Sequence, residues 1–324
     1  MAMAIGCGLP ASPPPTARLS TTIPGPIRTD DAATSILSDT DFLAVSRLIH
    51  RDTGILITAS KKSMLISRLS RRLRSLGLTD FADYVALLHG SDGAEERRAL
   101  VSAVTTNVTG FFREPHHFRA LADLGPSLVA RARAGGRVRI WSAGCSTGQE
   151  AFSIAATLLA IAPDIARHDL RILATDIDPA VIETARAGIF DRRALGEAVP
   201  PDLHRLVKDG PGKDQITLAP SLHELIRFQE LNLLQPWPFQ GQFDVIFCRN
   251  VVIYFDAETR LDLWMRFAAR MPKGGMLFIG HSERMDPRLD TLFTPVGITQ
   301  YERSARTAAP GPAAAETTPG SGKG

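Results

Sequence analysis

Short apolar runs that alternate with helical stretches occupy the chain after residue 119, and this alternation most constrains its fold. The β-rich runs cover residues 137–143, 170–175, 225–229, 243–248 and 276–280. Between several of them lie helical stretches, at residues 150–161, 179–187 and 257–270. Strands that alternate with helices form βαβ units, so we predict an α/β domain built on a doubly wound, mostly parallel, Rossmann-like sheet. In such sheets the ligand crevice lies outside the carboxyl ends of the strands.

The region before this alternation is predicted to be helical. Residues 39–113 show helical periodicity and no strand signal, and Asp39 or Thr40 is predicted to cap the first helix. The next three predicted helices cover residues 60–76, 80–88 and 95–105. We therefore predict a small all-α domain over residues 36–115, followed by the α/β domain over residues 116–303.

Other segments depart from both patterns. Residues 191–223 break the alternation with a Pro-Pro pair and a Gly-Pro-Gly turn, which predicts an inserted subdomain. Residues 1–35 and 304–324 are rich in proline or alanine and hold few large apolar residues. Such segments bury too little apolar surface to offset the loss of backbone entropy, so both tails are predicted to be disordered.

Composition excludes several classes of protein. The three cysteines lie far apart without metal-ligand spacing, so neither a disulfide framework nor a zinc site is expected. The longest nearly apolar run, residues 151–162, is shorter than the ~18 residues that suggest a membrane span. The opening residues lack the basic region of a secretory signal, so we expect a cytoplasmic protein with no direct membrane insertion. A net charge of +3 is too small to indicate nucleic-acid binding by itself.

The first strand and its following turn are candidates for a nucleotide crevice. The strand leads into Ser-Ala-Gly-Cys-Ser-Thr-Gly at residues 142–148, and a helix follows. Small residues let the backbone approach a ligand, and the helix N-terminus offers unpaired N–H groups. The pattern is not the dinucleotide GxGxxG, because only Gly144 and Gly148 are glycines. Any strand–turn–helix junction needs small residues, so the turn alone does not decide between structure and binding.

The second strand ends in two aspartates that suggest the kind of ligand. An acid at this place accepts hydrogen bonds from the ribose hydroxyls of a nucleoside. Asp178 precedes Pro179 and suits a helix cap, which leaves Asp176 for the ribose. No phosphate-binding GxxxxGK[ST] motif occurs, and Glu150 places negative charge where a pyrophosphate would lie. A nucleoside without phosphates and with a cationic end fits better, and S-adenosylmethionine has both properties.

Several motifs resemble those of the CheR-type chemotaxis receptor methyltransferases. They are TTNVTGFFRE at residues 105–114, WSAGCSTGQE at 141–150, TDID at 175–178, LNLL at 231–234, FDVIFCRNVVIYF at 243–255 and GHSE at 280–283. The resemblance extends over about residues 40–301 and implies a class I methyltransferase domain with an inserted β-subdomain, preceded by a small all-α N-terminal domain. It also implies transfer of methyl from S-adenosylmethionine to specific glutamates of chemoreceptors, for adaptation in chemotaxis, with S-adenosylhomocysteine as product and no metal.

The resemblance assigns roles to individual residues. Those implied for the cofactor are Asn107, Thr109 and Arg113 at its reactive end, Gly144 at the turn, Glu150 at its amino group, Asp176 at the ribose, Asn232 and Leu233 at the adenine, and Arg249 and Asn250 closing the site. Arg113 and Tyr254 are the catalytic candidates, since each can orient a substrate carboxylate. No catalytic base is needed, because a glutamate with a pKa of ~4.3 is already ionised at neutral pH.

A basic helix is the candidate partner surface. Lys61, Arg68, Arg71 and Arg72 share one helical face, and no acid lies between residues 53 and 79. The simplest interpretation of this basic face is a solvent-exposed surface without a partner. Another is that the protein is a nucleic-acid methyltransferase that binds phosphates there. The resemblance instead implies docking of the acidic cytoplasmic helices of receptors. In some members of that family a receptor C-terminal peptide also binds the inserted subdomain, and the sequence does not decide whether this chain has that partner. Cys-Arg-Asn-Val at residues 248–251 is not the loop of enzymes that methylate exocyclic base amines. A non-catalytic sensor of S-adenosylmethionine is the remaining alternative.

Overall fold

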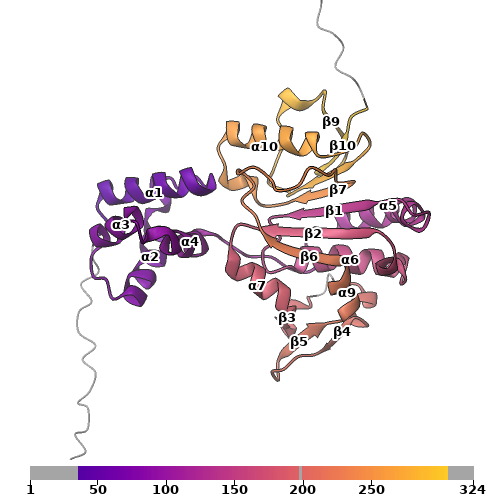
Figure 1. Cartoon of the computed structure of the whole chain (residues 1–324), viewed down its shortest axis with the longest axis horizontal. Coiled ribbons are helices and arrows are strands. Elements are labelled where there is room, and N and C mark those ends of the chain that lie inside the picture. The colour runs from indigo at the N-terminus through magenta and orange to yellow at the C-terminus, as the bar shows by residue number, and fades with distance from the viewer. Residues whose placement is uncertain (1–35, 197–198, 306–324) are drawn as a thin grey trace, which may run out of the picture. The chain divides into compact units, whose positions relative to one another are not determined.

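The computed structural model describes residues 36–196 and 199–305. The first predicted tail and residues 306–324 of the second lie outside this part of the chain. The N-terminal region is helical, with α1 (Asp39–Thr53), α2 (Lys62–Leu76), α3 (Phe81–His89) and α4 (Gly93–Val104) (Figure 1). The short 3₁₀ helices are η1 (Ala59–Lys61), η2 (Ile165–Arg167), η3 (Arg192–Ala194), η4 (Val252–Tyr254) and η5 (Pro287–Leu289). Among the described residues, no helix combines the length and apolar character needed to cross a membrane.

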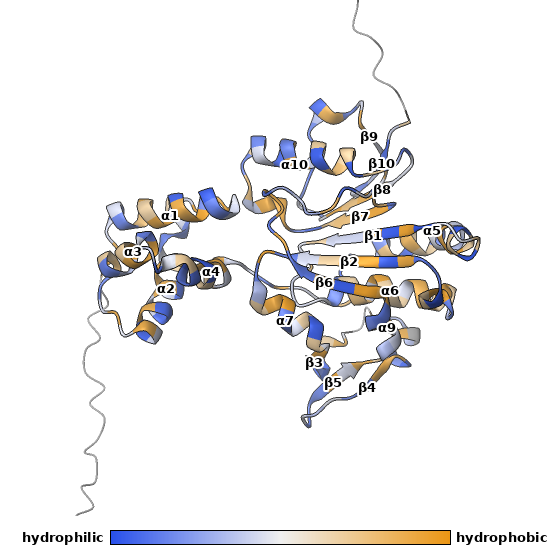
Figure 2. Ribbon diagram, viewed as in Figure 1, coloured by the Kyte–Doolittle hydropathy of each residue, from blue (hydrophilic) through white to orange (hydrophobic). Residues whose placement is uncertain are grey.

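Local signals define the ends of α1. The cap is Ser38, whose hydroxyl accepts a hydrogen bond from the Asp41 backbone N–H at 3.0 Å, so the prediction of Asp39 or Thr40 as cap is wrong by one or two residues. Gly54 ends the helix with φ of 73°. Figure 2 shows hydrophobic and hydrophilic bands alternating along α1, as expected for an amphipathic helix. Its apolar face joins those of α2, α3 and α4 in one core, which includes Phe42, Val45, Leu48, Ile49, Leu65, Leu69, Leu73, Phe81, Tyr84 and Leu100.

The α/β domain is built on a seven-stranded sheet in the order β6-β2-β1-β7-β8-β10-β9. Its strands are β1 (Val138–Ala143), β2 (Leu170–Asp176), β6 (Ile226–Glu230), β7 (Val245–Cys248), β8 (Met276–Ile279), β9 (Phe293–Gly297) and β10 (Gln300–Arg303). The first five strands of this order are parallel, which confirms the doubly wound sheet. The antiparallel pair β9 and β10 was not predicted from the sequence.

Helices cover both faces of this sheet. They are α5 (Pro115–Arg133), α6 (Gln149–Ile161), α7 (Pro179–Ala187), α9 (Pro220–Leu225) and α10 (Ala257–Ala269). Successive residues of β1 point to opposite faces, so Ile140 packs into one core and Trp141 into the other. Trp141 is fully buried, and its indole N–H donates to Thr175 Oγ1 at 2.9 Å. This bond and the parallel pairing of β1 with β2 place the carboxyl ends of the two strands side by side.

The helix α5 was missed by sequence analysis because Gly125 and Pro126 interrupt its pattern. A Cβ atom on Gly125 would lie 2.1 Å from Cδ1 of Ile161 in α6, so the glycine permits close packing of the two helices. A proline in a helix interior costs about 3 kcal/mol by itself. Burial of apolar residues of α5 against the sheet and α6 offsets this cost.

A second sheet is inserted between α7 and α9. Its strands, β3 (Ile189–Asp191), β4 (Val207–Asp209) and β5 (Gln215–Leu218), pair antiparallel in the order β3-β5-β4. The short helix α8 (Pro201–His204) precedes β4. The broken alternation predicted an inserted subdomain in this region, and the family resemblance implied that it is a β-subdomain.

Candidate cofactor and active site

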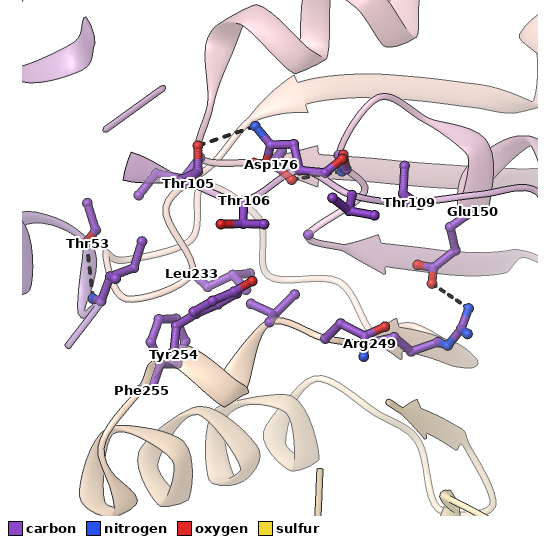
Figure 3. Close-up of a pocket in the computed structure, with 18 of the residues that line it drawn as sticks. Thr53, Thr105, Thr106, Thr109, Glu150, Asp176, Leu233, Arg249, Tyr254 and Phe255 are labelled. Atoms are coloured by element: carbon purple, nitrogen blue, oxygen red, sulfur yellow. Dashed lines mark hydrogen bonds and ion pairs between the residues drawn. The ribbon is translucent and has the colours of Figure 1, made fainter. Parts of the chain in front are cut away.

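A pocket lies outside the carboxyl ends of β1, β2 and β7, where the doubly wound sheet predicts a crevice. The loop of residues 105–110, between the helical domain and α5, forms part of its wall. All eleven residues assigned to the cofactor or to catalysis line it, namely Asn107, Thr109, Arg113, Gly144, Glu150, Asp176, Asn232, Leu233, Arg249, Asn250 and Tyr254. Figure 3 shows Asp176 and Thr109 on one side of the pocket, with Leu233 and Tyr254 on the other. Thr53 and Ile55, at the end of α1, also line the pocket and were not predicted.

The turn after β1 adopts backbone conformations that favour glycine. Gly144 has φ of 88° and Gly148 has φ of 97°. A Cβ atom on Gly144 would lie 2.2 Å from Cγ2 of Val251, so the turn also packs tightly against the loop after β7. The backbone N–H groups of Gly144 and Cys145 donate to the Thr175 carbonyl at 2.8 and 2.9 Å. These bonds bring the turn next to the acidic end of β2.

Asp176 is a buried carboxylate held by backbone donors. One oxygen accepts from Ser146 N at 2.8 Å and the other from Asp178 N at 3.1 Å. Burial raises its pKa, although the backbone bonds oppose that shift. Each carboxylate oxygen can accept a second hydrogen bond, so Asp176 retains capacity to hold hydroxyl groups in the pocket.

Asp178 has the capping role that its position before Pro179 predicts. Its carboxylate accepts from Ala180 N at 3.0 Å and so caps α7. The same carboxylate accepts from Ser102 Oγ at 2.5 Å and from Asn107 Nδ2 at 2.8 Å. The side chain of Asn107 is therefore turned toward Asp178, and it anchors the loop of residues 105–110 to the sheet.

Glu150 and Arg249 form a buried ion pair in the lining of the pocket, marked by a dashed line in Figure 3. Arg249 Nη1 donates to Glu150 Oε2 at 3.0 Å, and Ser142 Oγ donates to the other oxygen at 2.7 Å. Burial raises the pKa of Glu150, and the Arg249 charge opposes this shift. Arg249 also donates to the Arg113 carbonyl and lies 3.3 Å from Glu114 Oε2. Sequence analysis did not foresee Glu114.

Each of the two catalytic candidates has side-chain polar groups that are not paired within the described part of the chain and can therefore bind a substrate. Arg113 donates to the Val108 carbonyl at 3.0 Å, and no acidic partner is found for it among the described residues. The residues on either side, Phe112 and Glu114, have φ of 51° and 59°, a strained conformation for non-glycine residues. Tyr254 accepts a hydrogen bond from Leu56 N at its carbonyl, and within the described ranges its hydroxyl has no bonding partner.

Asn232 and Leu233 form the wall of the pocket near α1. Asn232 Nδ2 donates to the Asp52 carbonyl at 2.7 Å, and its Oδ1 accepts from Leu234 N at 2.9 Å. These bonds tie the end of β6 to the end of α1. Leu233 is 7% exposed and supplies an apolar surface.

Glu283 is a positioning group that sequence analysis missed, although its GHSE motif was noted. Its carboxylate accepts from the backbone N–H groups of Val251, Val252 and Gly280 at 2.9, 3.0 and 2.5 Å. It therefore fixes the loop after β7, in which Asn250 has φ of 60°. The sequence signal was a carboxylate just after a strand end, where unpaired N–H groups of a neighbouring loop converge.

The basic residues of α2 differ in their surroundings: some have partners within the chain and others are exposed. Arg68 Nη1 donates to the carbonyls of Val104 and Thr105 at 2.6 and 2.8 Å, and so supports the loop next to the pocket. Arg72 pairs at 2.5 Å with Glu96, which is 5% exposed. Both guanidinium groups are thus engaged with other parts of the chain, and their role in docking stays a prediction.

The other basic residues of this region remain nearer the surface. Arg71 and Arg74 are exposed, and neither guanidinium group has a hydrogen-bond or ion-pair partner in the described part of the chain. Lys61 is half-buried, with its Nζ 5.6 Å from the centroid of the Tyr254 ring. The surface available to a partner therefore centres on Arg71 and Arg74, with Lys61 toward the pocket.

One group of metal-ligand side chains lies beside the site. Glu114, His116 and His117 place one potential ligand atom each within 4.8 Å of one another. His117 is fully buried, its pKa is lowered to about 3 mainly by burial, and its Nε2 lies 2.8 Å from Thr299 Oγ1. The predicted absence of a metal stays a prediction.

The fold and the pocket define a Rossmann-like methyltransferase that uses S-adenosylmethionine. Residues 107–302 match the family described as "CheR methyltransferase, SAM binding domain", and residues 40–105 match "CheR methyltransferase, all-alpha domain". The chain belongs to the CheR methyltransferase family.

Relatives with similar sequences carry chemotaxis names. The chain is 47% identical to a probable chemotaxis protein methyltransferase of Rhizobium etli over 80% of its length and 98% of that protein. It is 42% identical to the chemotaxis protein methyltransferase of Escherichia coli, over 83% of the chain and 92% of that protein. Chemotaxis protein methyltransferase 2 of Pseudomonas aeruginosa is 41% identical over 81% of the chain and 92% of its own length.

Proposed function

We propose that this enzyme methylates the side-chain carboxylates of specific glutamates in the cytoplasmic helices of chemoreceptors. The products are glutamate methyl esters and S-adenosylhomocysteine, and the role is adaptation in chemotaxis or a related signalling pathway. The observation that carries the proposal is the joint presence of Arg113 and Tyr254 in a pocket with two buried carboxylates. The names of the relatives support the same substrate class.

The pocket residues fit S-adenosylmethionine on electrostatic grounds. Burial raises the pKa values of Glu150 and Asp176, so negative charge there is incompletely compensated and a cation would stabilise it. In the proposal, Asp176 accepts from the ribose hydroxyls, Glu150 meets the amino group, and Leu233 packs on the adenine. Asn107, Thr109, Gly144, Asn232, Arg249 and Asn250 complete the binding surface. When bound, the cofactor supplies an activated methyl group.

The protein's own contribution to the reaction is orientation. The substrate glutamate is ionised at neutral pH because its ordinary pKa is ~4.3, so no residue has to remove a proton. Arg113 can hold a carboxylate through two parallel N–H···O bonds, and the Tyr254 hydroxyl can donate a further one. Correct orientation can contribute up to about 7–11 kcal/mol in favourable cases.

Transfer of a radiolabelled methyl group distinguishes the candidate functions. With labelled S-adenosylmethionine, we expect label on a receptor cytoplasmic fragment, released by mild base as esters require. A fragment whose candidate glutamates are replaced by alanine is the control and should stay unlabelled. Label on DNA would instead indicate a nucleic-acid methyltransferase. Cofactor binding without transfer to any acceptor would indicate a sensor.

We propose that α2 and the adjoining surface dock the acidic receptor helices. Replacing both Arg71 and Arg74 by glutamate should weaken receptor binding about tenfold or more, because two favourable charges become unfavourable ones. Affinity for S-adenosylmethionine should stay unchanged, since neither residue lines the pocket. Wild-type receptor binding should also weaken as salt screens exposed charges over ~8 Å at physiological ionic strength.

The matched control for this test is the double variant Arg137→Glu with Arg227→Glu. Both arginines are exposed and lie outside the helical domain. If the control weakens receptor binding as much as the α2 variant, net charge rather than the α2 surface is responsible.

A further inference from the structure

Arg249 lies between two carboxylates, one buried and one partly buried, from separate segments of the chain. Its side chain is 2% exposed, and its Nη1 donates to Glu150 Oε2 at 3.0 Å. Its Nη2 lies 3.3 Å from Glu114 Oε2. Glu150 stands in the first turn of α6, and Glu114 is the residue before α5. One guanidinium is therefore shared by two acids.

The position of Glu114 is itself constrained. Its Oε1 accepts from His281 N at 3.2 Å and lies 2.9 Å from His281 Nδ1. Its backbone has φ of 59°, a conformation that a glutamate adopts only when its surroundings enforce it. Arg249 and the bonds from His281 outweigh burial and keep the pKa of Glu114 below its usual value, so it is ionised at neutral pH.

The charges of this group do not balance. One arginine faces two acids, so with both carboxylates ionised the group carries one surplus negative charge beside the pocket. Of the two acids, Glu150 lines the pocket, whereas Glu114 does not. If Glu114 were uncharged, Arg249 would neutralise Glu150 alone, and a cation in the pocket would meet a neutral ion pair.

We propose that Glu114 is a positioning residue that acts through Arg249: because it shares the guanidinium charge, the group of Glu114, Arg249 and Glu150 stays net negative toward the ammonium group of the cofactor. This inference rests on the proposed binding of S-adenosylmethionine in the pocket. It makes the affinity for the amino-acid end of the cofactor depend on a residue that does not line the pocket. A cation held instead by Glu114, His116 and His117 is disfavoured, because the Arg249 charge already lies against the Glu114 carboxylate.

The test compares two ligands that differ in the amino-acid end. S-Adenosylhomocysteine carries the ammonium group, and 5′-methylthioadenosine has the same nucleoside and sulfur without it. In Glu114→Gln, calorimetry should show about tenfold weaker binding of S-adenosylhomocysteine, which is the scale of a modest electrostatic contribution. Binding of 5′-methylthioadenosine should change by less than about twofold. Glu114→Asp keeps the charge at a greater distance from Arg249 and should show a smaller loss that is selective in the same way.

The matched control is Glu96→Gln, which also neutralises a buried, arginine-paired glutamate, in the helical domain. It should alter the affinity of neither ligand. Equal weakening of both ligands in the Glu114 variants would show a general distortion of the pocket and overturn the inference, as would unchanged affinity for S-adenosylhomocysteine. If the wild-type protein binds neither ligand, the proposed cofactor itself is wrong, which is a different result from failure of the Glu114 variants alone.

Discussion

Replacing Arg113 by alanine should slow methyl transfer about 100-fold or more at saturating cofactor, because small losses of reactant alignment carry penalties of that size. The guanidinium reaches the pocket and has no acidic partner among the described residues, so it is available to a substrate carboxylate. The contact between Arg249 and residue 113 uses the backbone carbonyl and survives the change. The measurement is single-turnover methylation of a receptor fragment between about pH 5 and 9.

Two features of that experiment make it decisive. The control is Arg119→Ala, an exposed arginine of α5, which should leave the rate unchanged. In the wild-type enzyme the rate should fall only as pH approaches the pKa of the substrate glutamate, and it should be level through neutrality. A clear dependence on a group that titrates near neutrality would contradict catalysis by orientation. His117 is not that group, because burial lowers its pKa to about 3.

The second large effect concerns stability. Arg72→Glu should lower the free energy of unfolding by about 3–5 kcal/mol, because it leaves a buried acid without its cation and adds a like charge. Glu96, the acid concerned, also accepts from the Tyr84 hydroxyl at 2.8 Å in the core of the helical domain. Burial raises the pKa of Tyr84 well above its usual value, so the phenol stays neutral and supplies Glu96 with a hydrogen bond but no compensating charge.

Denaturant unfolding of Arg72→Glu measures this effect. The comparison is Arg71→Glu, one residue away on the same helix but exposed, for which a change within about 0.5 kcal/mol is expected. Equal stability of the two variants would mean that the pair of Arg72 and Glu96 contributes nothing to the helical domain. In that case a loss of receptor binding in Arg72→Glu would report on docking. If the variant is destabilised, the same loss reflects unfolding of the helical domain.

Much of the fold follows from periodicity alone. Strands and helices bury one face or stripe each, so the spacing of apolar residues marks β1, β2, β7 and β8 and the four N-terminal helices without knowledge of their neighbours. This reasoning missed the helix α5, because Gly125 and Pro126 both disfavour a helix locally. Only the tertiary structure shows that Gly125 packs closely against Ile161. The same reasoning missed the pair β9 and β10, because β9 contains Pro295 and has four exposed residues, so it lacks a buried alternating face.

In the candidate site too, some features could be predicted from the sequence and others could not. By itself, the sequence determined that Asp178 caps a helix and that Asp176 is left for the pocket, because capping depends on neighbours two residues away. It also determined the glycine turn and the motifs that define the family. The sharing of Arg249 by Glu114 and Glu150, and the engagement of Arg68 and Arg72 inside the helical domain, were decided by tertiary structure alone. A charged side chain selects its partner by distance and burial in space, and residues far apart in the chain acquire both only when the domains fold.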